Sequence, residues 1–139
     1  MSQQRGHRLV PHTADLRIVA WAPTREGCVV EAVRAVLDAF LAPTSAGPLR
    51  TVTFDATGRT DADLLVSVLD EMIYLLDVSG EVPVAVGAET APDGLRVRFG
   101  LAPLSPDRVI GAGPKAVTLN DLEFGRSDDH WRCMVTLDV

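Results

Sequence analysis

The sequence contains few aromatic residues and few cysteines. Aromatic side chains make up 5% of the chain, so we expect a core built mainly from Val, Leu, Ile and Ala. The two cysteines, Cys28 and Cys133, stand in unrelated contexts without a CxxC pair, and the sequence therefore gives no support for a zinc site. An isolated cysteine in a helix is more often a small buried apolar residue than a nucleophile. We expect both thiols to be free in a reducing compartment.

Long apolar segments are missing as well. No apolar run reaches roughly 18 residues, the length that spans a bilayer, and no apolar signal segment follows the first five residues. We expect a cytoplasmic protein that makes no contact with a membrane.

Basic residues are outnumbered by acidic ones. The 13 Lys and Arg residues stand against 19 Asp and Glu residues, which gives a net charge of −6 at pH 7. Proteins that hold RNA or DNA by the phosphates need a basic face, so we expect no stable direct binding of nucleic acid. The signatures GxSxG, HExxH, GxGxxG and GxxxxGK[ST] are absent from the sequence.

Hydrophobic periodicity predicts two helices. Thr24 stands at a helix N-cap position, and the apolar residues that follow at helical spacing predict a helix to about Leu41. Thr60 is a second N-cap, with Asp63 where a capping box places its returning acceptor. The helix that follows has a broad apolar stripe and is predicted to end near Asp77.

The rest of the chain reads mainly as strands. Alternation of apolar and polar residues predicts strands at 9–22, 49–56, 82–88, 95–99, 116–119, 122–124 and 131–139. In the last of these, Trp131, Cys133, Val135 and Leu137 face one side. Residues 1–139 are therefore expected to form a single α+β domain, in which two main helices cover one face of a mixed β-sheet.

Two segments carry carboxylates at strand ends. The segment His12-Thr13-Ala14-Asp15 opens the first strand, and Asp138 lies next to the end of the last one. Short polar clusters at such positions often satisfy local backbone groups, and an Asp near a terminus is often solvated. If Asp15 and Asp138 meet, their oxygens form a site of the kind that hard cations such as calcium or magnesium prefer. The pattern alone leaves both interpretations open.

Lys115 follows a loop that contains glycine, in the segment Gly-Pro-Lys-Ala-Val-Thr at 113–118. A lysine there could reach a phosphate, an acidic partner or a nucleotide. Alternatively, Lys115 is a surface residue that only aids solubility.

Four segments in this order resemble the archease family. They are HTAD at 12–15, the second helix at 63–77, KAVT at 115–118 and the alternating strand at 131–139 with its final Leu-Asp-Val. The match is collinear over almost the whole chain. The sequence departs from the family pattern at four positions, namely Leu119 and Asn120 in place of Tyr-His, Val68 in place of Trp, and Asp70 in place of Asn.

The resemblance implies an accessory protein that catalyses nothing alone. It would activate an RtcB-type RNA ligase, an enzyme that uses manganese and GTP and passes through a guanylated histidine. Its role would be to promote guanylation and multiple turnover in tRNA splicing or RNA repair. Carried over by motif, Asp15 and Asp138 would be metal ligands, and Val139 would add a main-chain oxygen.

The same resemblance implies further contacts. Lys115 would touch the ligase or its nucleotide, and His12 and Thr13 would support the metal ligands. Oxygen ligands favour a divalent ion other than zinc, with calcium as our first expectation and magnesium or manganese as alternatives.

Two other functions stay open from the sequence. A chaperone-like interaction module would bind partners without depending on Asp15, Asp138 or Lys115. A small metal-dependent hydrolase would use Asp15, Asp138 and His12, although the chain shows no clear pair of base and nucleophile.

Overall fold

The computed structural model describes residues 4–10 and 15–139. Its elements follow the order β1 (Gly6–Val10), β2 (Asp15–Ala22), α1 (Arg25–Phe40), β3 (Arg50–Thr57), α2 (Asp61–Ser79), β4 (Glu81–Ala91), β5 (Gly94–Pro103), a short 3-10 helix (Pro106–Arg108), β6 (Ala116–Ser127) and β7 (His130–Asp138). Among these residues, no helix combines the length and apolar composition that crossing a membrane would need.

The strands form two separate sheets. One has four strands in the order β1-β2-β7-β6, and the other has three in the order β3-β5-β4. All neighbouring strands are antiparallel. The α+β class with two main helices is confirmed, whereas the single mixed sheet was wrong. The reason lies in the connections: α1 carries the chain from one sheet to the other, and β5 lies between β3 and β4, the two strands that α2 joins.

The helices begin where the capping residues predict. Thr24 Oγ1 accepts a hydrogen bond from Gly27 N at 3.0 Å at the start of α1. At α2, Thr60 Oγ1 accepts from Asp63 N at 3.1 Å, and the Asp63 carboxylate accepts from Thr60 N at 3.3 Å, which completes the capping box. The second helix runs two residues past the predicted end, to Ser79, before Gly80 ends it in the left-handed conformation at φ 64°.

Two strand predictions needed correction. The predicted strand 9–22 is a hairpin pair instead, β1 and β2, and Pro11, which has no N–H to donate to a sheet, falls between them in the sequence. The predicted strands 116–119 and 122–124 form the single strand β6, whose pairing with β7 shifts between Thr118 and Glu123. Asp121 lies in that irregular stretch with φ 58°, a left-handed conformation that Asp tolerates better than most residues.

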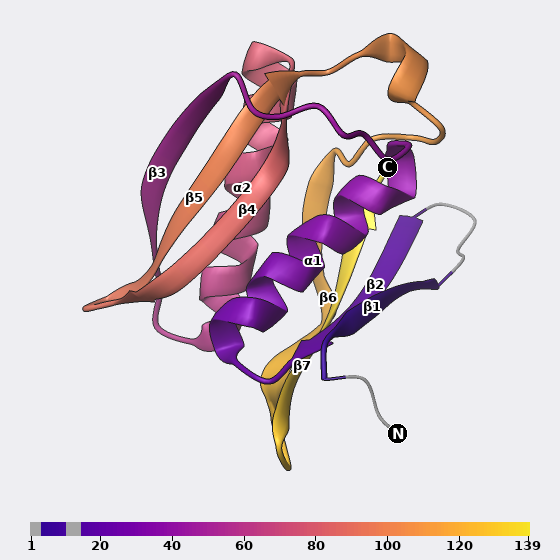
Figure 1. Ribbon diagram of the computed structural model, residues 1–139. Helices are drawn as coiled ribbons and strands as arrows, with labels where there is room; N and C mark the ends of the chain where they lie inside the picture. The colour runs from indigo at the N-terminus through magenta and orange to yellow at the C-terminus, as the bar shows by residue number, and fades with distance from the viewer. Residues whose placement is uncertain (1–3, 11–14) are drawn as a thin grey trace.

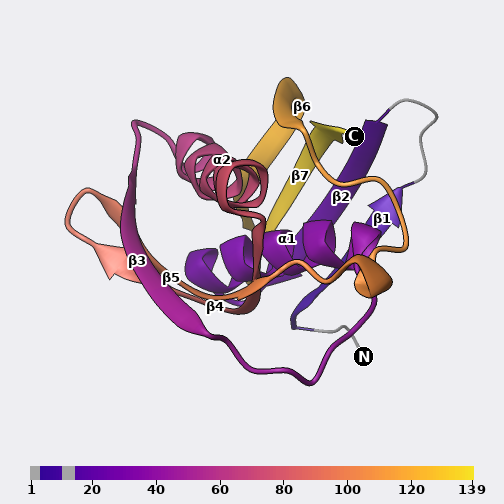
Figure 2. The same cartoon turned by 90° about the horizontal axis from the view of Figure 1, so that it is seen from above.

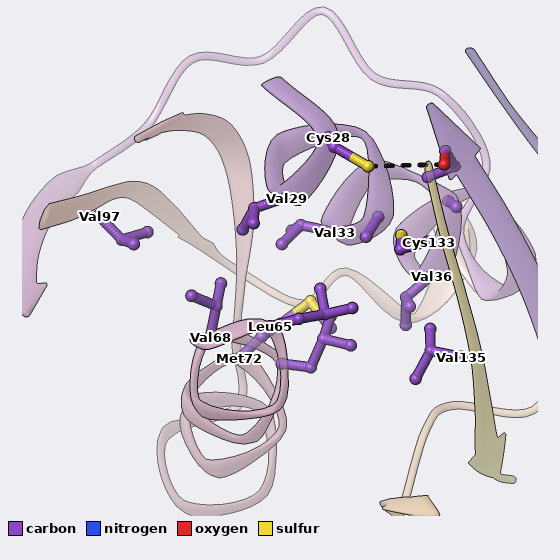
Figure 3. Close-up of a cluster of buried hydrophobic side chains, with 14 of the residues drawn as sticks. Cys28, Val29, Val33, Val36, Leu65, Val68, Met72, Val97, Cys133 and Val135 are labelled. Atoms are coloured by element: carbon purple, nitrogen blue, oxygen red, sulfur yellow. Dashed lines mark hydrogen bonds between the residues drawn. The ribbon is translucent and has the colours of Figure 1, made fainter. Parts of the chain in front are cut away.

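The helices lie between the two sheets, and each contacts strands of both (Figures 1 and 2). Figure 3 shows Val29, Val33 and Val36 of α1 above Leu65, Val68 and Met72 of α2, and all six are buried. Of the side chains predicted to share one face of β7, Cys133, Val135 and Leu137 are fully buried, and Trp131 packs against the same cluster. The position of α1 between the two sheets explains why ten of its 16 residues are buried.

Both cysteines are free and buried in this core, as predicted. Cys28 Sγ donates to the carbonyl oxygen of Ala20 at 3.5 Å (Figure 3), and Ala20 pairs with Cys133 across β2 and β7. The neighbouring Cys133 thiol and, second, burial raise the pKa of the Cys28 thiol. The thiol of Cys28 therefore stays protonated at neutral pH.

Candidate functional site

Three strands of the four-stranded sheet begin or end along one edge. The strand β2 begins at Asp15, β7 ends at Asp138, and β6 begins at Ala116. Because these strands are antiparallel neighbours, their ends meet, and β7 lies in the middle (Figures 1 and 2). The fold thus brings the start of β2 next to the end of β7 at this edge.

Asp15 and Asp138 are direct register partners across β2 and β7. Residues paired in this way have their Cβ atoms about 5 Å apart on the same face of the sheet. Asp15 is half-buried and Asp138 is exposed. Two carboxylates in this arrangement repel each other, so a bound cation would be stabilised there.

Lys115 is tied to the same edge through its backbone. Its amide N donates to the carbonyl oxygen of Asp138 at 2.8 Å. Its exposed side chain borders a hollow that the C-terminal half of α2 lines, with Asp70, Tyr74 and Asp77 among the lining residues. Partial burial raises the pKa of the Asp70 carboxyl. The lysine ammonium therefore faces an acidic surface of α2, and no ion pair joins it to an acidic group within the described chain.

Two residues of this face were not singled out from the sequence. Arg17 Nη2 pairs with Asp121 Oδ2 at 3.1 Å. Thr136 pairs with Arg17 across the strands and is 5% exposed, and its hydroxyl has no hydrogen-bond partner among the described residues. Both lie two positions from a predicted ligand, on the same side of the strand. The alternation of residues in a strand was the signal that could have found them.

The side chains at this edge supply part of the ligand set that a hard cation needs. Asp15 and Asp138 offer carboxylate oxygens, the ligands that calcium and magnesium prefer. No cluster of three or more His, Cys, Asp or Glu residues suited to a metal occurs in 4–10 and 15–139. Main-chain oxygens, such as that of Val139, and water would have to complete the coordination. His12 and Thr13, the predicted supporting residues, lie outside the described residues.

Comparison with known proteins identifies the family. The family model described as "Archease protein family (MTH1598/TM1083)" matches residues 7–139. The chain belongs to the archease family. It is 50% identical over 134 residues to a Mycobacterium tuberculosis protein named "Probable protein archease", a match that covers 96% of this chain and 75% of the relative. The "Protein archease" of Methanopyrus kandleri is 29% identical over 136 residues, covering 94% and 96% of the two chains.

Solved structures of the archease family share the fold. The solution structure of Methanobacterium thermoautotrophicum protein 1598 has a TM-score of 0.75 at 20% identity and covers 96% of this chain and 99% of its own. A Thermotoga maritima crystal structure, described as "an archease, possible chaperone", has a TM-score of 0.65 at 19% identity and covers 94% of both chains. At these identities the likeness establishes the fold alone.

Proposed function

We propose that the protein is a metal-binding accessory factor that activates an RtcB-type RNA ligase. In this role it promotes guanylation and repeated turnover of the ligase during tRNA splicing or RNA repair, and catalyses no reaction itself. Membership of the archease family supports the proposal, as does the acidic net charge of −6, which leaves RNA binding to the ligase.

The observation that carries the proposal is the pairing of Asp15 with Asp138 at the edge to which Lys115 is hydrogen-bonded. The HTAD segment is far from the KAVT and LDV segments in the sequence, and the fold brings one residue of each together. The two carboxylates and a main-chain oxygen of Val139 would hold a divalent ion, with calcium as the first expectation. The ion would supply positive charge between the carboxylates and hold the ends of β2 and β7 together.

Lys115 would act beside the metal site rather than in it. Its side chain borders the hollow along α2, whereas Asp15 and Asp138 share the outer face of the sheet. An exposed ammonium suits a phosphate or a carboxylate of the docked partner. The ligase would then contact the sheet edge and the C-terminal half of α2 together.

Guanylate labelling of the ligase tests this function. The purified cognate ligase is incubated with labelled GTP and a divalent ion, with and without the protein, and the labelled ligase is counted over time. We expect the protein to raise the labelling rate while incorporating no label itself. Equal rates with and without the protein would reject the proposal.

A chaperone-like interaction module is the second candidate, favoured by the description of the Thermotoga maritima structure as a "possible chaperone". Such a module would suppress aggregation of unrelated heated proteins and would do so equally well after Asp15→Asn or Asp138→Asn. An activator of one ligase would leave unrelated proteins to aggregate. Light scattering with two unrelated client proteins distinguishes the two functions.

A further inference from the structure

A second hollow lies on the outer face of the four-stranded sheet, at the end of β2 and β7 away from Asp15 and Asp138. It has a volume of about 540 Å³, and its lining includes Arg8, Val19, Trp21, Asp129, His130 and Arg132. This volume lies within the range of small-molecule sites, roughly 300–1,000 Å³. Neither the sequence motifs nor the proposed function uses these residues.

Strand register explains why the hollow is open. Gly6, Trp21, Arg132 and Gly125 form one row across β1, β2, β7 and β6. The two large side chains stand in the middle, and the glycine at each end of the row has no side chain to cover them. A Cβ added at Gly125 would meet no atom within 4 Å. The flanks of Trp21 and Arg132 are therefore accessible to a ligand.

The charge of the hollow is positive in an acidic protein. Arg8 lies in the next row, paired with Val19. Within the described chain, neither Arg8 nor Arg132 forms an ion pair or a side-chain hydrogen bond. The carboxylate of Asp129 is already paired with His130 at 3.2 Å, and this hydrogen bond lowers the pKa of Asp129. Asp129 therefore stays ionised, and the two guanidinium groups outweigh this one carboxylate in attracting an anion.

The lining also offers a flat apolar surface beside these charges. Trp21 is half-buried, and Val19, two residues before it on the same face of β2, is 4% exposed. Aromatic side chains stack on nucleic-acid bases of any sequence, and arginine binds phosphate through two parallel hydrogen bonds. Two arginines neutralise one phosphate group, which is too little charge to hold a long polyanion against a net charge of −6.

We propose that this hollow binds a nucleoside monophosphate. The base stacks on Trp21, and Arg8 and Arg132 hold the phosphate. The inference goes beyond the proposed function and does not depend on it, because the hollow and the carboxylate edge lie at opposite ends of the sheet.

Tryptophan fluorescence tests the site directly. The chain has two tryptophans, Trp21 and Trp131. Trp131 lies on the opposite face of the sheet, where it packs edge-on against Phe124 at a centroid distance of 5.6 Å. Trp131→Phe therefore leaves Trp21 as the sole reporter without altering the hollow. We expect AMP or GMP to quench its emission in a saturable way, and adenosine or guanosine to bind at least about tenfold more weakly.

Variants of the two arginines test which residues bind the nucleotide. Arg8→Gln and Arg132→Gln should each weaken nucleotide binding by about tenfold or more. Arg98→Gln, which removes an exposed arginine of the other sheet, should leave binding unchanged. If Trp131→Phe fails to fold, calorimetry measures nucleotide binding to the unmodified protein and to Trp21→Leu instead. Arg132→Gln should still activate the ligase, so failure of this site and failure of the proposed function are separable.

Three results would overturn the inference. One is the absence of quenching or heat with AMP and GMP up to about 10 mM. Another is equal affinity in the unmodified protein and both arginine variants. The third is tighter binding of an acidic peptide that contains tryptophan than of either nucleotide, which would assign the hollow to a protein partner.

Discussion

The register of β2 with β7 places Asp15 and Asp138 opposite each other. This pairing is what makes the two carboxylates candidate ligands of one metal ion. The sequence motifs point to both carboxylates, but their meeting depends on which strands are neighbours, and this is a property of the whole fold. Alternation along each strand places Arg17 on the side of Asp15 and Thr136 on the side of Asp138, but that the two residues also meet depends on the same strand pairing. The pairing leads to a direct prediction.

Removing either carboxylate should weaken metal binding. Asp15→Asn and Asp138→Asn should each lower the affinity for calcium by at least about tenfold, because affinity follows the number of charged ligands. Asp93→Asn, at an exposed carboxylate in the turn between β4 and β5, is the matched control and should bind as the unmodified protein does. Calorimetric titration with calcium, magnesium and manganese measures the effect. Unchanged affinity in both variants would remove the pair from the metal site.

The buried thiol of Cys28 predicts a loss of stability at alkaline pH. Its raised pKa keeps the proton in the folded state, while the unfolded thiol ionises near its ordinary pKa of about 8.5. The free energy of unfolding should therefore be fully retained below about pH 8.5 and fall by up to about 1.4 kcal/mol per pH unit above it. Because the contact with Cys28 lowers the pKa of Cys133, the comparison is made in a Cys133→Ala background, where adding Cys28→Ala should remove this part of the slope, since alanine does not titrate.

Urea unfolding of both proteins between about pH 7 and pH 10 checks this effect. Tyr74 and the other alkaline groups are common to the two proteins, so only the difference between their profiles is interpreted. Parallel profiles would show that Cys28 ionises in the folded state as easily as in the unfolded one.

At the scale of elements, the helices were more predictable than the sheets. Helix starts depend on local contacts, such as the cap at Thr24 and the capping box of Thr60 and Asp63, and the structure contains both. Sheet membership depends on pairing between distant segments, and alternation within one strand does not specify its neighbours. The single predicted sheet therefore became two, and the two short strands around Asp121 became the one irregular strand β6.

The capping box of α2 should contribute measurable stability. Thr60→Ala removes the oxygen that accepts from Asp63 N at 3.1 Å and should lower the free energy of unfolding by about 0.5–2 kcal/mol. Thr60→Ser retains the hydroxyl and should lose much less. Urea denaturation of the three proteins measures the effect, and an equal loss in both variants would mean that the hydroxyl is not the cause. Ligase activation should survive in both, because Lys115 borders the other end of the helix.

At the scale of the whole molecule, the four-stranded sheet carries two different surfaces. The carboxylate edge and the backbone of Lys115 lie at one end, and the hollow of Arg8, Trp21 and Arg132 lies at the other. The motifs led to the first surface because they resemble a known family. The second carries no motif and arises only when β1, β2 and β7 are side by side, so the sequence alone could not predict it.

The central claim is that the edge formed by Asp15, Asp138 and Lys115 activates an RNA ligase. Multiple-turnover joining of an RNA with a cyclic-phosphate end, by the cognate RtcB-type ligase with GTP and a divalent ion, tests it most directly. The account predicts that the unmodified protein joins no RNA alone, raises the turnover of the ligase, and loses most of this effect in Lys115→Ala. That variant should keep a normal circular dichroism spectrum, because an exposed loop lysine contributes little to packing. Turnover that is the same with and without the unmodified protein, or full activation by Lys115→Ala, would contradict the account.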